Sequence, residues 1–175
     1  QGRNILDGVA ILHEIDHKLY RKKLNGVVLK IDFEKMYDKA KWPIFQQTPR
    51  MKGFSAEWRA MIHSFVSGGS VAIKVNDDTG HFFLMKKGLR QCDSLSPMLF
   101  NIVADMLEVM IERAKVDDQI EGVVNHLVDG GLSILQYADD TILFMDHDLE
   151  KARNMKLVLS AFEQLSGLKI NFHKS

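Results

Sequence analysis

The stretch Leu-Gln-Tyr-Ala-Asp-Asp-Thr-Ile-Leu-Phe, residues 135–144, places two adjacent acids, Asp139 and Asp140, between two apolar runs. Residues 133–137 and 141–145 are both rich in strand-forming side chains, and the short polar break between them favours a tight hairpin. Two carboxylates at its tip repel each other, and the repulsion is relieved either by water on an exposed turn or by divalent cations. A solvated turn is the commoner outcome for an isolated Asp-Asp pair. The rest of the chain has to decide between these alternatives.

The composition of the chain is that of an ordinary folded protein. With 175 residues, of which 46% are hydrophobic and 26% charged, it suits one domain over residues 1–175 with a core of its own. Basic and acidic residues number 23 each, so the net charge gives no sign of a nucleic-acid partner. That argument is weak, because acids gathered around a metal would hide basic residues in the sum. The single cysteine, Cys92, excludes an internal disulfide.

No apolar run is long enough to cross a bilayer, and the first residues lack the pattern of a signal peptide. We therefore expect an intracellular protein with no membrane partner. The chain begins without Met and stops abruptly at Ser175. It is expected to be a piece of a longer polyprotein.

Helical and strand patterns mix along the chain and predict an α+β fold. Apolar residues at helical spacing predict helices over residues 5–23, 55–65, 96–111 and 148–166. A two-residue period on both sides of a turn at residues 76–80 predicts a second hairpin, over residues 70–85. Pro43 and Pro49 are expected to interrupt any long helix in the mixed stretch between residues 34 and 52.

Asp32 stands near the end of a β-branched strand, residues 27–33, where burial is expected. If this strand lies beside the 133–145 hairpin in an antiparallel sheet, the carboxylates of Asp32, Asp139 and Asp140 meet at one edge. Hard oxygen ligands of this kind suit Mg²⁺. A pair of such ions activates an attacking hydroxyl and stabilises the leaving oxygen of a phosphoryl transfer.

Four segments of the chain resemble, in order and spacing, the motifs of reverse transcriptases from non-LTR (LINE-type) retrotransposons, most closely those of plants. They are Leu-Lys-Ile-Asp-Phe-Glu-Lys-Met-Tyr-Asp (29–38), Gly-Leu-Arg-Gln-Cys-Asp-Ser-Leu-Ser-Pro (88–97), Gln-Tyr-Ala-Asp-Asp (136–140) and Gly-Leu-Lys-Ile-Asn-Phe-His-Lys-Ser (167–175). Tyr-Ala-Asp-Asp alone is only moderately specific, whereas the four motifs together are specific. The resemblance implies a polymerase palm-like antiparallel sheet with helices packed on one face, plus part of the fingers. The thumb and the endonuclease would lie outside these residues.

By position, the resemblance implies a metal site with two Mg²⁺ ions, for which Mn²⁺ could substitute. Asp32 and Asp139 would hold both ions, and Asp140 would be an adjacent, secondary ligand or charge. The backbone carbonyl of Phe33 would be a further ligand beside the nucleotide. Lys174 matches a lysine that is a candidate proton donor to the leaving pyrophosphate, although the bare sequence makes it a surface lysine.

The resemblance also implies a site for the incoming nucleotide. Tyr37 matches an aromatic gate whose ring would clash with the 2′-OH of a ribonucleotide, although without the family it could equally be a packed core ring. Gln91 would contact the nucleotide or the template, and Arg90 would support its loop. The implied partners are an RNA template, a DNA primer and a dNTP, and the implied location is the nucleus.

The second motif departs from the family pattern. Cys92 stands where the family has glycine, and Ser94 where it has proline. A side chain at residue 92 could clash if the backbone there has positive φ or touches the nucleotide. The alternative hypothesis is therefore a catalytically inactive, decayed retroelement copy that retains the fold or residual nucleic-acid binding, and we expect weak or absent activity.

A zinc site is the rival interpretation of another segment. His13-Glu-Ile-Asp-His17 matches the H-E-x-x-H pattern on a predicted helix. A third ligand is missing, since Tyr20 and Lys23 occupy the positions of the glycine and histidine that would supply it. We rank zinc hydrolysis far below the polymerase hypothesis.

Overall fold

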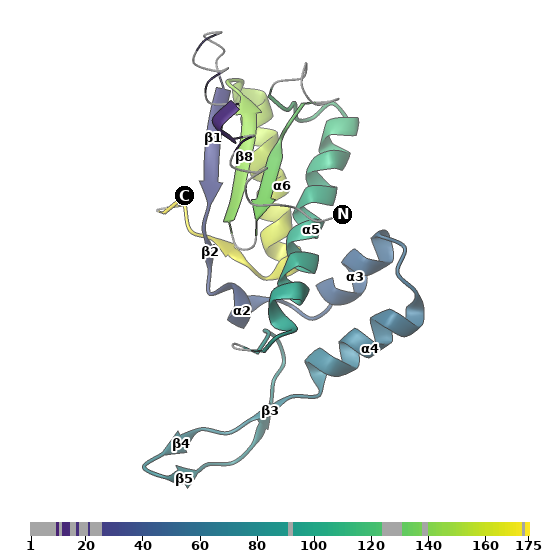
Figure 1. Cartoon of the computed structure of the whole chain (residues 1–175), viewed down its shortest axis with the longest axis vertical. Helices are drawn as coiled ribbons and strands as arrows, with labels where there is room; N and C mark the ends of the chain where they lie inside the picture. Colours follow the sequence, from purple (N-terminus) through teal and green to yellow (C-terminus); the bar gives the residue numbers. More distant parts are fainter. Residues whose placement is uncertain are drawn as a thin grey trace. The chain divides into compact units, whose positions relative to one another are not determined.

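Figure 1 shows the chain as a computed structural model in which helices and antiparallel strands mix. The structure describes residues 10, 12–14, 17, 21, 26–90, 93–123, 131–137, 140–172 and 174–175. The chain forms two compact units. Unit 1 comprises Gln1–Glu34, Leu107–Phe162 and Ile170–Ser175, and unit 2 comprises Lys35–Met106 and Glu163–Lys169.

Unit 1 is built on a three-stranded antiparallel sheet in the order β1-β8-β7 (Figure 1). Its strands are β1 (Gly26–Ile31), β7 (Ile134–Tyr137) and β8 (Asp140–Asp146). All six residues of β1 pair with residues 141–146 of β8, and Tyr137 pairs with Asp140 at the closed end of the β7–β8 hairpin. The predicted hairpin, and the strand predicted beside it, are both confirmed.

The central strand β8 is buried on both faces. Leu143 and Phe144 are consecutive, so their side chains point to opposite faces of the sheet, and both are 0% exposed. On one face, Phe144 packs in a cluster with Val123 and Leu12. A charged side chain at the middle of this strand would be costly, which restricts the acids to its two ends.

Helix α6 (Leu149–Ser166) begins and ends where the sequence predicts. The Asp148 carboxylate accepts hydrogen bonds from the backbone N–H groups of Glu150 (2.7 Å) and Lys151 (2.9 Å), as an N-cap does. Gly167 follows the last turn with a φ of +78°, which glycine adopts without strain. Buried side chains recur on the helix at core-facing spacing, at Met155, Leu159 and Phe162.

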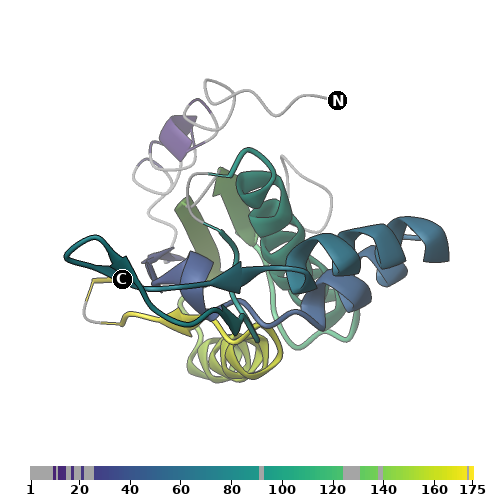
Figure 2. The same ribbon diagram turned by 90° about the horizontal axis from the view of Figure 1, so that it is seen from below.

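Unit 2 contains the short helices that follow the first motif. They are α2 (Met36–Lys39), α3 (Ile44–Met51) and α4 (Ala56–Ser67), and α3 and α4 pack against each other (Figure 2). Ser55 caps α4 as predicted, since its hydroxyl accepts from the Trp58 N–H at 3.2 Å. Residues 34–52 hold no long helix, as predicted, although Pro49 lies buried inside the eight-residue α3 and not at its end. So short a helix loses a single backbone bond to proline, and the Phe54 N–H reaches the Pro49 carbonyl at 2.9 Å.

The predicted hairpin of residues 70–85 is present, but its turn is shorter than predicted. The strands β3 (Ser70–Val71) and β6 (Phe83–Leu84) pair, as do β4 (Lys74–Val75) and β5 (Asp78–Thr79). Asn76 and Asp77 alone make the turn, with φ of 48° and 65°. Asn and Asp tolerate this left-handed conformation, so two residues suffice where five were predicted.

The remaining elements join or flank these. The long helix α5 runs over Ser96–Val116, and β2 (Phe33–Glu34) pairs with β9 (Lys169–Ile170). Of the helix predicted over residues 5–23, the described positions are helical and the others lie outside the described residues. Among the described residues, no helix is long and apolar enough to span a membrane.

Candidate active site

The register of β1 against β8 brings two of the predicted site residues together. The pairs run from Gly26 with Asp146 to Ile31 with Thr141. Asp32 directly follows β1, and Asp140 directly precedes Thr141 in β8. Two acids 108 positions apart in the sequence therefore lie at the same end of the β1–β8 pairing. Asp139, the third predicted carboxylate, lies outside the described residues.

A lysine of β1 neutralises part of this charge. The Lys30 ammonium lies 2.7 Å from a carboxylate oxygen of Asp140, and both side chains are more than half exposed. Lys30 pairs with Ile142, two residues after Asp140, so the ion pair runs diagonally across the ladder on the face that Asp32 also shares. Such an exposed pair adds little stability, but it places a positive charge beside the predicted metal ligand.

The C-terminal residues hold the backbone of Asp32 on both sides. The Asn171 N–H donates to the Asp32 carbonyl at 2.8 Å, and the Asp32 N–H donates to the Ser175 hydroxyl at 3.3 Å. That hydroxyl donates in turn to the Asn171 carbonyl at 2.9 Å. Lys174 belongs to this same segment and its side chain is exposed. Sequence reasoning missed Asn171 and Ser175, because backbone bonding by a short polar segment leaves no pattern.

The donor set at this end of the sheet fits a hard divalent cation. It offers carboxylate oxygens from Asp32, directly after β1, and from Asp140, the first residue of β8, and these are the ligand type that Mg²⁺ and Mn²⁺ prefer. Within the described part of the chain, no group of three metal-ligating side chains is assembled. The described residues therefore supply two of the three predicted carboxylates.

Phe33 follows Asp32 in β2, and its ring packs against Phe162 of α6 with centroids 5.9 Å apart. This contact lies within unit 1 and is half-buried. It anchors the main chain immediately beyond Asp32. The predicted role of the Phe33 carbonyl as a metal ligand stays a prediction.

Tyr37 and Arg90, two of the predicted nucleotide-binding residues, both belong to unit 2. The half-buried Tyr37 ring packs on Phe100 of α5, with centroids 6.1 Å apart. The Tyr37 carbonyl accepts from the Leu89 N–H at 2.6 Å, and the Ala40 carbonyl accepts from the Gly88 N–H at 2.8 Å. The first and second motifs are therefore joined backbone to backbone.

Arg90 is exposed but lies over a glycine. A Cβ built on Gly69 would stand 2.9 Å from the Arg90 guanidinium, so this side chain runs over the glycine. The sequence did not reveal this contact. Gln91 and Cys92 lie outside the described residues.

Acids also lie at the opposite end of β8, where they have a structural role. Burial, followed by the nearby charge of Glu121, raises the pKa of the Asp146 carboxyl. Hydrogen bonding from the Lys151 backbone N–H lowers the pKa of Asp148, in keeping with its place at the start of α6. Acids at this end of the strand cap and border a helix.

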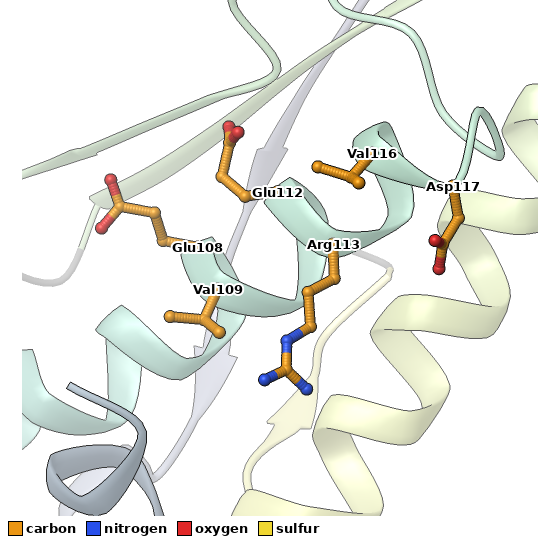
Figure 3. Close-up of a pocket in the computed structure, with 6 residues that line it drawn as sticks. All are labelled: Glu108, Val109, Glu112, Arg113, Val116 and Asp117. Atoms are coloured by element: carbon orange, nitrogen blue, oxygen red, sulfur yellow. The ribbon is translucent and has the colours of Figure 1, made fainter. Parts of the chain in front are cut away.

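Two other features lie apart from this sheet end. His13 and His17 are exposed, and no third metal-ligating side chain accompanies them among the residues described. A hollow of about 560 Å³ lies along α5 (Figure 3). Its lining residues are Glu108, Val109, Glu112, Arg113, Val116 and Asp117. None of them belongs to a sequence motif or to the sheet edge, so the hollow is separate from the candidate active site.

Unit 1 therefore carries acids at one end of its sheet, and unit 2 carries the backbone bonds that join Tyr37 and Ala40 to Gly88 and Leu89. Over residues 1–175 the chain matches the family described as "Reverse transcriptase (RNA-dependent DNA polymerase)". The chain therefore belongs to the reverse transcriptase family. This confirms the family that the four motifs indicated.

Curated relatives narrow the resemblance to non-LTR retrotransposons. The chain is 25% identical over 163 residues to a "Retrovirus-related Pol polyprotein from type-1 retrotransposable element R2" of Popillia japonica, covering 91% of this chain and 26% of that protein. It is 24% identical over 176 residues to the "Transposon TX1 uncharacterized 149 kDa protein" of Xenopus laevis, covering 99% and 13%. The chain thus spans about a quarter or less of these proteins. The closer likeness to plant elements stays a prediction.

Solved structures of telomerases share the fold. A telomerase from Candida albicans, in complex with a fragment of telomeric RNA, superposes with a TM-score of 0.67 at 14% identity, covering 98% of this chain and 30% of that one. An apo telomerase from Candida tropicalis gives 0.67 at 17% identity, covering 99% and 35%. These similarities confirm the α+β palm-like fold. At such low sequence identity these similarities show the fold alone.

Proposed function

We propose that this chain is the palm, with part of the fingers, of an RNA-directed DNA polymerase that extends a DNA primer with dNTPs along an RNA template. The observation that supports the proposal is the β1–β8 register, which ends at Ile31 and Thr141, next to Asp32 and Asp140. Asp139 directly precedes Asp140 in the sequence, and with Asp32 and Asp140 it would supply the acids that phosphoryl transfer requires.

In the proposed reaction, the oxygen of the primer 3′-hydroxyl attacks the α-phosphorus of the dNTP. The bond from that phosphorus to the pyrophosphate oxygen breaks, and the hydroxyl proton leaves to water. Asp32, Asp139, Asp140 and the Phe33 carbonyl would hold two Mg²⁺ ions, whose charge favours the ionised hydroxyl and the leaving group. Lys174, in the segment bonded to Asp32, would give a proton to the pyrophosphate.

Selection of the nucleotide falls to unit 2. The ring of Tyr37, supported by Phe100, would exclude the 2′-OH of a ribonucleotide. Gln91 would contact the incoming nucleotide or the template. Arg90, lying over Gly69, would support the Gln91 loop.

Primer extension by the full-length protein tests this function. We expect DNA synthesis on a primed RNA template with Mg²⁺ or Mn²⁺. Asp32→Asn and Asp139→Asn should each lower it by about a thousandfold or more, since losing a metal ligand removes several kcal/mol of transition-state stabilisation. Mn²⁺ binding, followed by electron paramagnetic resonance, should weaken in parallel. Full extension by Asp32→Asn would refute the proposal.

The same assay decides whether the chain is a decayed copy. Cys92→Gly restores the residue that the family pattern carries at this position. Extension by the unmodified protein that is lost in Asp139→Asn would reject decay. Extension that appears only after Cys92→Gly would support it.

A further inference from the structure

The indole of Trp42 spans the joint between the first and second motifs. Its N–H donates to the Gly88 carbonyl at 2.9 Å, across 46 residues of sequence. The Gly88 N–H and the Leu89 N–H donate back to the carbonyls of Ala40 and Tyr37. We call these five residues the gate junction. Two consecutive residues, Gly88 and Leu89, thus make three hydrogen bonds to the segment that carries Tyr37.

Gly88 allows the two main chains to approach closely. Its φ is +84°, and a Cβ there would stand 3.0 Å from the carbonyl oxygens of both Tyr37 and Asp38. The Gly88 backbone is also buried. Because no side chain separates the chains, their spacing is set by backbone atoms and by the Trp42 bond.

The gate junction lies between two residues of the proposed nucleotide site, Tyr37 and Arg90. Tyr37 stands at one side, with its ring on Phe100. Arg90 directly follows Leu89 on the other, with its side chain over Gly69. A shift of the Gly88 backbone would therefore displace the segments that carry Tyr37 and Arg90.

We propose that Trp42 is a positioning residue for nucleotide selection. Its hydrogen bond to Gly88 fixes the position of the Tyr37 segment relative to the Arg90 segment. A change at this bond therefore alters both the discrimination against ribonucleotides and the contact with the base pair or template. This inference rests on the proposed function for its catalytic consequence. The mechanical coupling stands on the hydrogen bonds alone.

Trp42→Phe in the full-length protein removes the N–H donor but keeps an aromatic ring. Loss of one such bond should speed hydrogen–deuterium exchange about fivefold in peptides covering residues 36–40 and 86–90, measured by mass spectrometry. Discrimination against ribonucleotides, taken as the ratio of kcat/KM for dATP to that for ATP, should fall several-fold. Circular dichroism should stay unchanged.

The matched control is Trp58→Phe, which changes the other tryptophan of the chain. Trp58 lies on α4 with its ring on Phe54, at a centroid distance of 4.5 Å. It should leave both readouts as in the unmodified protein. Unchanged exchange in Trp42→Phe, or faster exchange in only one of the two segments, would overturn the coupling.

The two proposals fail separately. If the unmodified protein extends no primer, the polymerase function is refuted in this chain, while the exchange data still decide the coupling. If the protein is active and Trp42→Phe loosens both segments with unchanged discrimination, the positioning role is wrong and the polymerase function stands.

Discussion

The sheet end around Asp32 and the gate junction around Gly88 are positioned by different physical means. At the sheet end, six backbone pairs between β1 and β8 set the register. This register determines the positions of the acids. At the gate junction, three separate hydrogen bonds and one glycine hold the segment around α2 and the loop around Gly88 together. A ladder tolerates the loss of one contact, because its register is fixed by many. The gate junction has no such redundancy.

The largest effect on stability should come from removing a buried side chain of the central strand β8. Leu143→Ala removes a fully buried side chain from β8 and should lower the free energy of unfolding by about 2–5 kcal/mol. Urea denaturation measures it. Val28→Ala, at a half-exposed position on β1, is the control and should cost about 1 kcal/mol or less. Equal losses in the two variants would contradict a core centred on β8.

The next effect tests the close approach at the gate junction. Gly88→Ala should cost about 2–3 kcal/mol of unfolding free energy, because it adds both backbone strain and contact with two carbonyl oxygens. Gly53→Ala is the matched control, since Gly53 has a φ of +81° but a Cβ added there would meet nothing within 4 Å. It should cost about 1–2 kcal/mol from strain alone. Equal losses of unfolding free energy in the two variants would show that the close approach at Gly88 does not affect stability.

A smaller effect on stability should come from Asp148, an acid that caps a helix and lies outside the candidate active site. The pKa of Asp148 is lowered in the folded state, so its stabilisation is complete above its unfolded pKa of about 3.9 and is lost as pH falls through the lower folded value. Asp148→Asn should lower the Tm at pH 7, and Asp148→Ala should lower it further by removing the cap acceptor. Calorimetry should find the difference between Asp and Asn shrinking below about pH 4. A difference independent of pH would contradict the role of the charge.

The smallest effect on stability concerns Lys30. Lys30→Gln should change the free energy of unfolding by less than about 1 kcal/mol, since the pair with Asp140 is exposed. It should also tighten Mn²⁺ binding several-fold, because a positive charge beside a ligand opposes a cation. The control is Lys74→Gln, which breaks an equally exposed pair with Asp77 and should leave Mn²⁺ binding unchanged. Weaker binding in Lys30→Gln would reverse the assigned role of this charge.

Features with a local cause could be predicted from the sequence. Ser55 and Asp148 cap their helices as expected, because a capping side chain bonds within its own turn. The β7–β8 hairpin formed where strand-forming runs flank a polar break. The turn at Asn76 and Asp77 is shorter than predicted, because Asn and Asp tolerate the left-handed conformation that a two-residue turn requires.

The sequence by itself determined the order of strands and helices, the family and the acids of the candidate site, since all of these depend on residue type and spacing along the chain. Tertiary structure alone decided that Asp32 and Asp140 lie at the same end of the β1–β8 pairing, that Asn171 and Ser175 hold the backbone of Asp32, and that Trp42 bonds to Gly88. Each of these pairs joins residues far apart in the sequence. Their approach is set by strand register and by hydrogen bonds to backbone groups, which every residue type offers alike and which therefore leave no mark in the sequence.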